Sequence, residues 1–133
     1  MADAITYVTD THALIWYLTA SPRLGESARQ AFGNVAEGKA KLIVPLIVIA
    51  ELIFVIEHSR AQIELAQVID LLQRNPSVEI APLTLEIVLE MQKLTAIAEM
   101  HDRLIVCETQ MRKAKLITRD RKIRNTQFVE MVW

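Results

Sequence analysis

Short runs of β-branched, aliphatic and aromatic residues alternate with helix-length segments along the chain, and this alternation constrains the fold more than any other feature. The runs begin at Ile5, Lys41, Val78 and Lys115, and the segments between them have helical spacing. Because parallel strands need a helix-length crossover, this order predicts a mainly parallel sheet with helices on both faces. We therefore expect an α/β fold of three layers, with a central mainly parallel β-sheet flanked by α-helices.

Proline and polar positions mark where the expected elements end. Pro45 lies at a strand-to-helix turn, and Asn75 precedes a proline, which disfavours helical geometry. The expected strands cover residues 5–9, 41–44, 78–83, 115–118 and 128–133. The expected helices cover residues 13–18, 26–39, 47–59, 63–75, 84–96 and 103–115.

Length and composition exclude several classes of protein. A chain of 133 residues leaves no room for a second core, so we expect one domain over residues 1–133, and a hydrophobic fraction of 52% excludes a disordered chain. The single cysteine, Cys107, excludes a disulfide scaffold, and we expect it to be buried. Residues 1–7 lack signal-peptide features, and the most apolar stretch, residues 42–56, is too short to span a membrane. We therefore expect a cytoplasmic protein without a membrane segment.

Positive charge is concentrated near the end of the chain, although the formal net charge is only −1. Residues 112–124 contain seven basic residues and one acidic residue, so this segment carries +6 and the remainder carries −7. Such asymmetry predicts a patch that attracts anions, whereas a solvated helix end and loop would explain the same charges without a ligand. The basic residues are Arg112, Lys113, Lys115, Arg119, Arg121, Lys122 and Arg124.

Four carboxylates occupy positions that suggest a shared site. Asp10 and Asp120 each follow an expected strand, and ligands of open parallel sheets bind at this carboxyl edge. Glu51 lies in an otherwise apolar segment, where an ionised side chain needs a partner. Asp102 lies at the start of an expected helix, where a carboxylate complements the helix dipole. If the four converge, they repel one another unless a divalent cation compensates, and oxygen ligands favour Mg²⁺ or Mn²⁺.

Each of these acids also has a purely structural interpretation. Asp10 and Asp102 could cap helices, in which a side-chain oxygen accepts a backbone N–H. Asp120 could be a turn residue, and Glu51 could pair with a buried arginine. The functional interpretation therefore rests on the four acids taken together.

Four segments resemble, in order and spacing, the successive motifs of PIN-domain proteins, and most closely those of the VapC-like toxin ribonucleases. They are TDTHALIW at residues 9–16, IAEL at 49–52, EMHDRLIV at 99–106 and LITRDRKI at 116–123. Because they extend over essentially the whole chain, the resemblance implies a single PIN domain. It further implies an endoribonuclease that uses Mg²⁺ or Mn²⁺, is silenced by a cognate antitoxin and forms a homodimer.

The resemblance also implies which residues act. Asp10, Glu51, Asp102 and Asp120 match the family's four acidic positions, which hold one or two metal ions that activate a water for attack on phosphorus. Thr118 matches the family's hydroxyl residue two positions before the last acid, and Thr11 is a weaker candidate to orient a carboxylate. The residues expected to contact substrate phosphates or bind substrate are Arg121, Lys122, Arg124 and His101.

One departure from the pattern concerns the rim of the site. Many relatives carry Asp-Pro-Phe before the third acid, whereas this chain has Glu99, Met100 and His101 there. Two other functions remain compatible with the sequence. They are a catalytically silent PIN-fold binding module and a structure-specific DNA nuclease.

Overall fold

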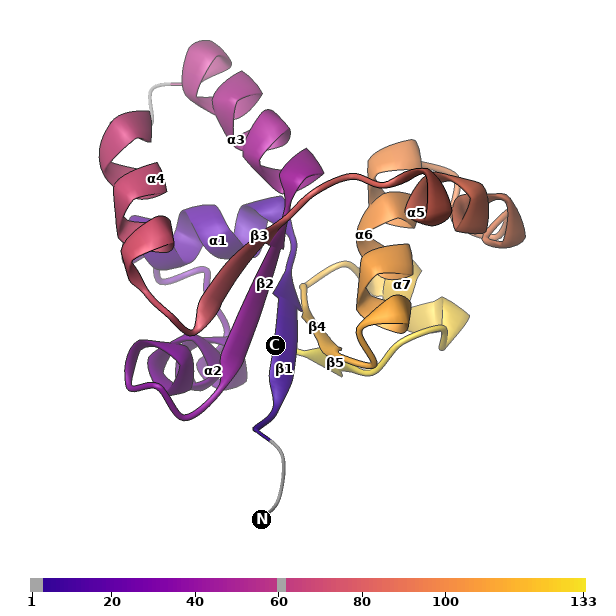
Figure 1. The fold of residues 1–133 in the computed structure, drawn as a ribbon, viewed down its shortest axis with the longest axis horizontal. Helices are drawn as coiled ribbons and strands as arrows, with labels where there is room; N and C mark the ends of the chain where they lie inside the picture. The colour runs from indigo at the N-terminus through magenta and orange to yellow at the C-terminus, as the bar shows by residue number, and fades with distance from the viewer. Residues whose placement is uncertain (1–3, 60–61) are drawn as a thin grey trace.

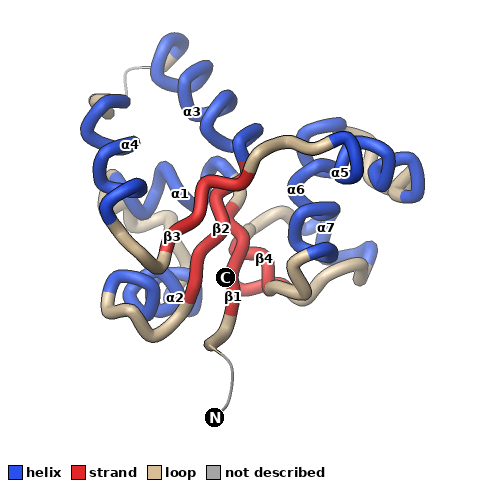
Figure 2. The backbone as a smooth tube through the Cα atoms, in the orientation of Figure 1, coloured by secondary structure: helices blue, strands red, loops and turns tan. Residues whose placement is uncertain are grey.

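The computed structural model describes residues 4–59 and 62–133, so the N-terminal segment expected to lack a signal peptide lies partly outside the described residues. Five strands form one parallel sheet in the order β3-β2-β1-β4-β5 (Figure 2), which confirms the α/β prediction. The strands are β1 (Thr6–Thr9), β2 (Lys41–Pro45), β3 (Val78–Ala81), β4 (Lys115–Ile117) and β5 (Met131–Val132).

The centre of the sheet forms the core because its strands are covered on both faces. Val8 of β1 is opposite Ile43 of β2 and Leu116 of β4 in the register of the sheet. Val8 and Leu116 are fully buried, which fits the nearly continuous apolar character of these runs. The parallel register places the carboxyl ends of β1, β2 and β4 along one edge of the sheet.

Helices form the two outer layers. Figure 1 shows α1, α2 and α4 on one side of the sheet and α5, α6 and α7 on the other, with α3 beyond the carboxyl edge. The helices are α1 (Thr11–Leu18), α2 (Glu26–Ala36), α3 (Leu46–His58), α4 (Leu65–Arg74), α5 (Leu85–Glu90), α6 (Met100–Met111) and α7 (Arg121–Thr126), with a 3₁₀ turn at Met91–Lys93. In the described part of the chain, no helix is both long enough and apolar enough to cross a bilayer. Cys107 is 1% exposed, as expected.

Several helix boundaries differ from those expected from the sequence. The helix expected over residues 26–39 ends at Ala36, before Gly38, whose positive φ of 76° interrupts the helix. The helix expected over residues 84–96 is only six residues long and continues as the 3₁₀ turn. α7 was not expected at all, because Ile123 is its only buried residue and a six-residue segment shows no apolar period.

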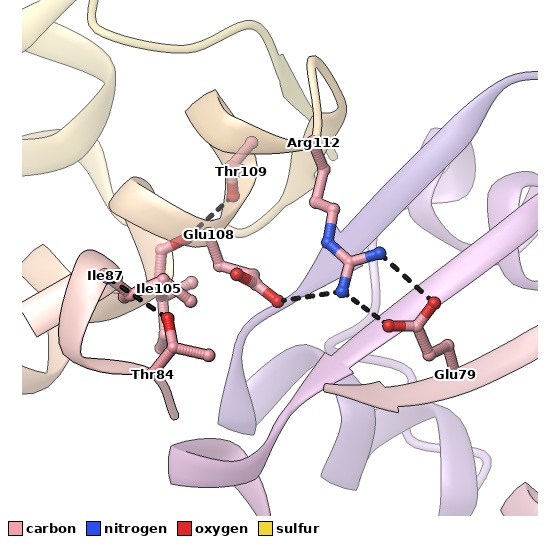
Figure 3. A network of polar contacts seen from close by, with 7 residues as sticks. All are labelled: Glu79, Thr84, Ile87, Ile105, Glu108, Thr109 and Arg112. Carbon is pink, nitrogen blue, oxygen red and sulfur yellow. Dashed lines mark hydrogen bonds and ion pairs between the residues drawn. The ribbon is translucent and has the colours of Figure 1, made fainter. Parts of the chain in front are cut away.

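An ionic network ties α6 to the edge strand β3 (Figure 3). The guanidinium of Arg112, directly after α6, donates to both carboxylate oxygens of Glu79 and lies 3.5 Å from Glu108. Glu108 is 3% exposed, and burial raises the pKa of its carboxyl group. The hydrogen bond from Arg112 lowers the pKa of the Glu79 carboxyl group. The network therefore fixes the C-terminal end of the helix whose first turn contains Asp102.

Candidate active site

Five acidic side chains line one pocket of about 580 Å³ at the carboxyl edge of the sheet: the four that the sequence singles out, Asp10, Glu51, Asp102 and Asp120, and in addition Glu99. Asp10 directly follows β1, and Asp120 lies three residues beyond the end of the neighbouring strand β4. Glu51 comes from the middle of α3, and Asp102 comes from the first turn of α6. The structure therefore brings together the four carboxylates that the sequence singles out.

Thr118 joins the two acids that follow strands. Its hydroxyl donates a hydrogen bond to one oxygen of Asp10 and accepts one from the backbone N–H of Asp120 at 3.1 Å. The other oxygen of Asp10 accepts from the N–H of Ala13 at 2.9 Å, so Asp10 also caps α1. Thr118 is completely buried, which leaves its hydroxyl little freedom to choose other partners. Thr118 therefore fixes the orientation of Asp10 relative to Asp120.

Glu51 is held by a hydroxyl and an imidazole. The Thr11 hydroxyl donates to one oxygen of Glu51 at 2.8 Å, and Thr11 itself is 5% exposed. His101 Nδ1 lies 3.6 Å from the other oxygen and 3.0 Å from an oxygen of Glu99. Glu51 therefore pairs with Thr11 and His101, and not with the buried arginine of the structural interpretation. These contacts also place His101 at the rim, beside the carboxylates.

Asp102 does not cap α6, which corrects that structural interpretation. The cap is Glu99, whose carboxylate accepts from the N–H of Asp102 at 2.9 Å, so the helix begins at Met100. Asp102 thus lies within the first turn of the helix and lines the pocket. The sequence could not separate the two possibilities, because both acids are within reach of the first turn.

The carboxylates repel one another across the pocket. Burial raises the pKa of Asp102 to about 6, and the negative charges of Glu99, Asp120, Glu51 and Asp10 add to this effect. Burial also raises the pKa of Asp10, against the hydrogen bonds from Thr118 and Ala13. Asp102 and Asp10 therefore lie in the negative field of neighbouring carboxylates, which a bound cation would relieve.

The donor set suits a hard divalent cation, since carboxylate oxygens are the ligands that Mg²⁺ and Mn²⁺ prefer. Among the described residues, no three acidic, histidine or cysteine side chains already lie close enough to surround an ion. Binding of a cation would therefore require these side chains to move closer together. The four acids fit a divalent cation in their chemistry.

The lining of the pocket also includes cationic and aromatic side chains, most of which sequence reasoning missed. They are Arg23, Arg119, His12, Trp16 and Trp133. The sequence contained two weak signals. His12 and Trp16 are four residues apart, which places both on one face of a helix, and Arg119 directly precedes Asp120. Nothing in the sequence placed the C-terminal tryptophan beside them.

None of the three basic residues expected to contact substrate phosphates lines the pocket. Arg121 and Lys122 are exposed in the first turn of α7, and Arg124 is exposed further along the same helix. Among the described residues that line the pocket, the basic side chains are Arg119 and Arg23 instead. The α7 residues therefore flank the site, where they remain available to a longer substrate.

The sequence belongs to the PIN domain family, because the profile of that family matches residues 7–129. No curated protein matches the sequence. The fold is also shared with solved toxin–antitoxin proteins. A chain of VapBC2 from Rickettsia felis, solved with a fragment of promoter DNA, has a TM-score of 0.71 at 16% identity and covers 96% of this chain and 97% of its own.

Two further structures show the same likeness. VapC20 of Mycobacterium tuberculosis, described as a toxin that cleaves the sarcin–ricin loop, has a TM-score of 0.69 at 11% identity, with coverage of 96% of this chain and 99% of its own. A chain of VapBC-1 from nontypeable Haemophilus influenzae has a TM-score of 0.67 at 20% identity, with coverage of 96% of both chains. At these identities the likeness shows the fold.

Proposed function

We propose that the protein is a divalent-metal-dependent endoribonuclease and the toxin of a toxin–antitoxin pair. The observation that carries this proposal is the meeting of Asp10, Glu51, Asp102 and Asp120 in one pocket at the carboxyl edge of the sheet. Membership of the PIN family supports it, as does the description of a protein with the same fold as an RNA-cleaving toxin.

Asp10, Glu51, Asp102 and Asp120 would hold Mg²⁺ or Mn²⁺. A cation in this position supplies acidity to a bound water and charge to stabilise the leaving oxygen of a phosphodiester. Thr118 and Thr11 hold the carboxylates of Asp10 and Glu51 in the orientations described above.

The basic residues bind the substrate. Arg119 and Arg23 line the same pocket as the acids and would bind phosphates next to the bond to be cut. His101 orients Glu51 and lies at the rim, where it would also meet the RNA. Arg121, Lys122 and Arg124 would contact phosphates farther along the strand.

We propose two protein partners for the chain. Several structures with this fold are described as complexes of a toxin with an antitoxin, which supports an antitoxin partner here. Exposed apolar side chains on α3 and α5 support a homodimer, because a monomer would leave them in water. They include Phe54, which is 63% exposed, and Leu85, which is 73% exposed. We place the protein in the cytoplasm, where RNA and such partners are available.

The test is cleavage of labelled single-stranded RNA by the purified protein with Mn²⁺, with Mg²⁺ and with EDTA. We expect cleavage that needs the metal and is lost in Asp10→Asn and Asp102→Asn. The matched control is Asp70→Asn, since Asp70 is an exposed residue of α4 that pairs with Arg74. Cleavage that survives both site variants would refute the four-carboxylate site.

Two other results would redirect the assignment. Preference for a DNA flap over single-stranded RNA would favour a structure-specific DNA nuclease. Metal binding, measured by calorimetry, without cleavage of any nucleic acid would favour a catalytically silent binding module. The three functions thus give different outcomes in the same set of measurements.

A further inference from the structure

An aromatic and cationic cluster lines the same pocket as the carboxylates. The rings of Trp16 and Trp133 meet edge to face, with centroids 5.7 Å apart and planes inclined by 68°. The guanidinium carbon of Arg119 lies 4.8 Å from the centroid of the Trp16 ring. His12, one turn before Trp16 on α1, has its ring centroid 5.7 Å from that of Trp16. These side chains all line the pocket that holds the four acids.

The fold makes specific room for this cluster. The carbonyl of Trp133 accepts a hydrogen bond from the N–H of Ser27 at 3.1 Å, which fixes the residue against the start of α2. A Cβ atom at Gly25 would lie 2.6 Å from both the carbonyl carbon and the ring of Trp133. Gly25 has an ordinary backbone conformation, with φ of −65°, so the close approach accounts for the glycine. Two segments far apart in sequence thus place the second tryptophan at the pocket.

We propose that Trp16 and Trp133 form a stacking platform for one unpaired base of the RNA, next to the phosphate that faces the carboxylates. This inference rests on the proposed ribonuclease function and specifies how that site binds its substrate. Bases of single strands stack on aromatic side chains and on guanidinium planes, and such stacking tolerates different sequences. The pocket thereby requires an unpaired nucleotide, because a base inside a duplex has no free face.

Arg119 occupies the place of the incoming base on Trp16. Its side chain is exposed, and a cation–π contact at an exposed position is weaker than the stacking of a base. The guanidinium is also a preferred partner of phosphate. When RNA enters, the base therefore takes the ring face of Trp16 and Arg119 moves to the neighbouring phosphate.

Intrinsic fluorescence tests the platform directly, since Trp16 and Trp133 are the two tryptophans of the sequence. The Asp10→Asn protein in EDTA is titrated with a short single-stranded oligoribonucleotide, while anisotropy of a label on the RNA follows binding. We expect saturable quenching that parallels binding. An abasic ribose-phosphate chain of the same length should bind more weakly and leave the emission nearly unchanged.

Each other outcome has a defined meaning. Binding without quenching, or equal quenching by the abasic chain, would overturn the platform and leave the proposed function intact. No binding at all would overturn both. Quenching by RNA combined with a wild-type protein that cleaves nothing would overturn the ribonuclease function alone.

Kinetics give a second, independent readout. We expect Trp16→Leu to raise KM for single-stranded RNA about tenfold with little change in kcat, and Trp16→Phe to restore KM, because phenylalanine keeps an aromatic face. Tyr17→Leu is the control, since Tyr17 is a half-buried aromatic residue of the same helix and lies outside the pocket lining. A fall in kcat at unchanged KM would contradict a role in stacking.

The position of Trp133 can be altered without changing either tryptophan. Gly25→Ala forces the Trp133 ring away from its place, so quenching by the oligoribonucleotide should fall. Gly33→Ala, inside the helix that Gly25 precedes, is the control, because a Cβ there meets no atom within 4 Å. Equal quenching in the two alanine variants would show that the placement of Trp133 is irrelevant to the base.

Discussion

Replacing Asp102 with asparagine should stabilise the metal-free protein at neutral pH. In the folded state the pKa of Asp102 is raised from the ordinary value of 3.8 to about 6, by burial and then by the surrounding carboxylates. The ionised form is therefore less favourable in the fold than in the unfolded chain. This cost is fully present above pH 6 and disappears as the pH falls through 6 towards 4.

The size of the effect follows from the two pKa values. A difference of about 2 pKa units sets an upper limit of ~3 kcal/mol. Solvent screening of this half-buried group lowers the figure to ~1.5 kcal/mol. The carboxylate also lies in the first turn of α6, where its attraction to the helix dipole offsets ~0.5 kcal/mol of this cost. We therefore expect Asp102→Asn to raise the free energy of unfolding by ~1 kcal/mol.

The assay is urea unfolding in EDTA at pH 7.5 and again at pH 4, with Asp70→Asn as the control for loss of a surface charge. The variant should gain stability at the higher pH only. Addition of Mn²⁺ should stabilise the wild-type protein more than the variant, because a ligand that binds only the folded state shifts unfolding. A variant that is no more stable than the wild type at pH 7.5 would refute the idea that the carboxylates repel one another.

Three further outcomes follow from other contacts. Thr118→Val should lower the rate of RNA cleavage by about 10- to 100-fold and Thr118→Ser should restore it, because only the serine hydroxyl can still orient Asp10; an unchanged rate in the valine variant would contradict this role. Arg112→Leu should lower the free energy of unfolding by ~1–2 kcal/mol at pH 7.5 and by less at pH 5. The reason is that Glu108 loses its cation, and its raised pKa lets protonation relieve the cost at acid pH; equal losses in urea at both pH values would speak against it. Arg119→Gln should reduce the slope of log affinity against log salt by about 1, measured by RNA anisotropy, whereas Arg74→Gln on α4 should leave it unchanged.

The sequence by itself determined the layered fold and the identity of the acids. Alternating apolar runs and helix-length crossovers predict the parallel sheet, because burial on both faces requires continuous apolar strands. Asp10 and Asp120 could be placed at one edge for the same reason, since parallel strands end together. Helix α7 escaped prediction, because its single buried residue, Ile123, leaves no period to detect.

Only the tertiary structure decided which other side chains share the pocket with the four carboxylates. Asp102 and Glu99 are equally good caps in the sequence, and the geometry of the first turn of α6 gives the cap to Glu99. Trp133 reaches the pocket through β5 and a hydrogen bond to α2, and Gly25 leaves the space for its ring. Local sequence carries the period of an element and the set of residues that could cap it. The place of Trp133 in the pocket lining is set by packing between elements distant in sequence, which no local pattern encodes.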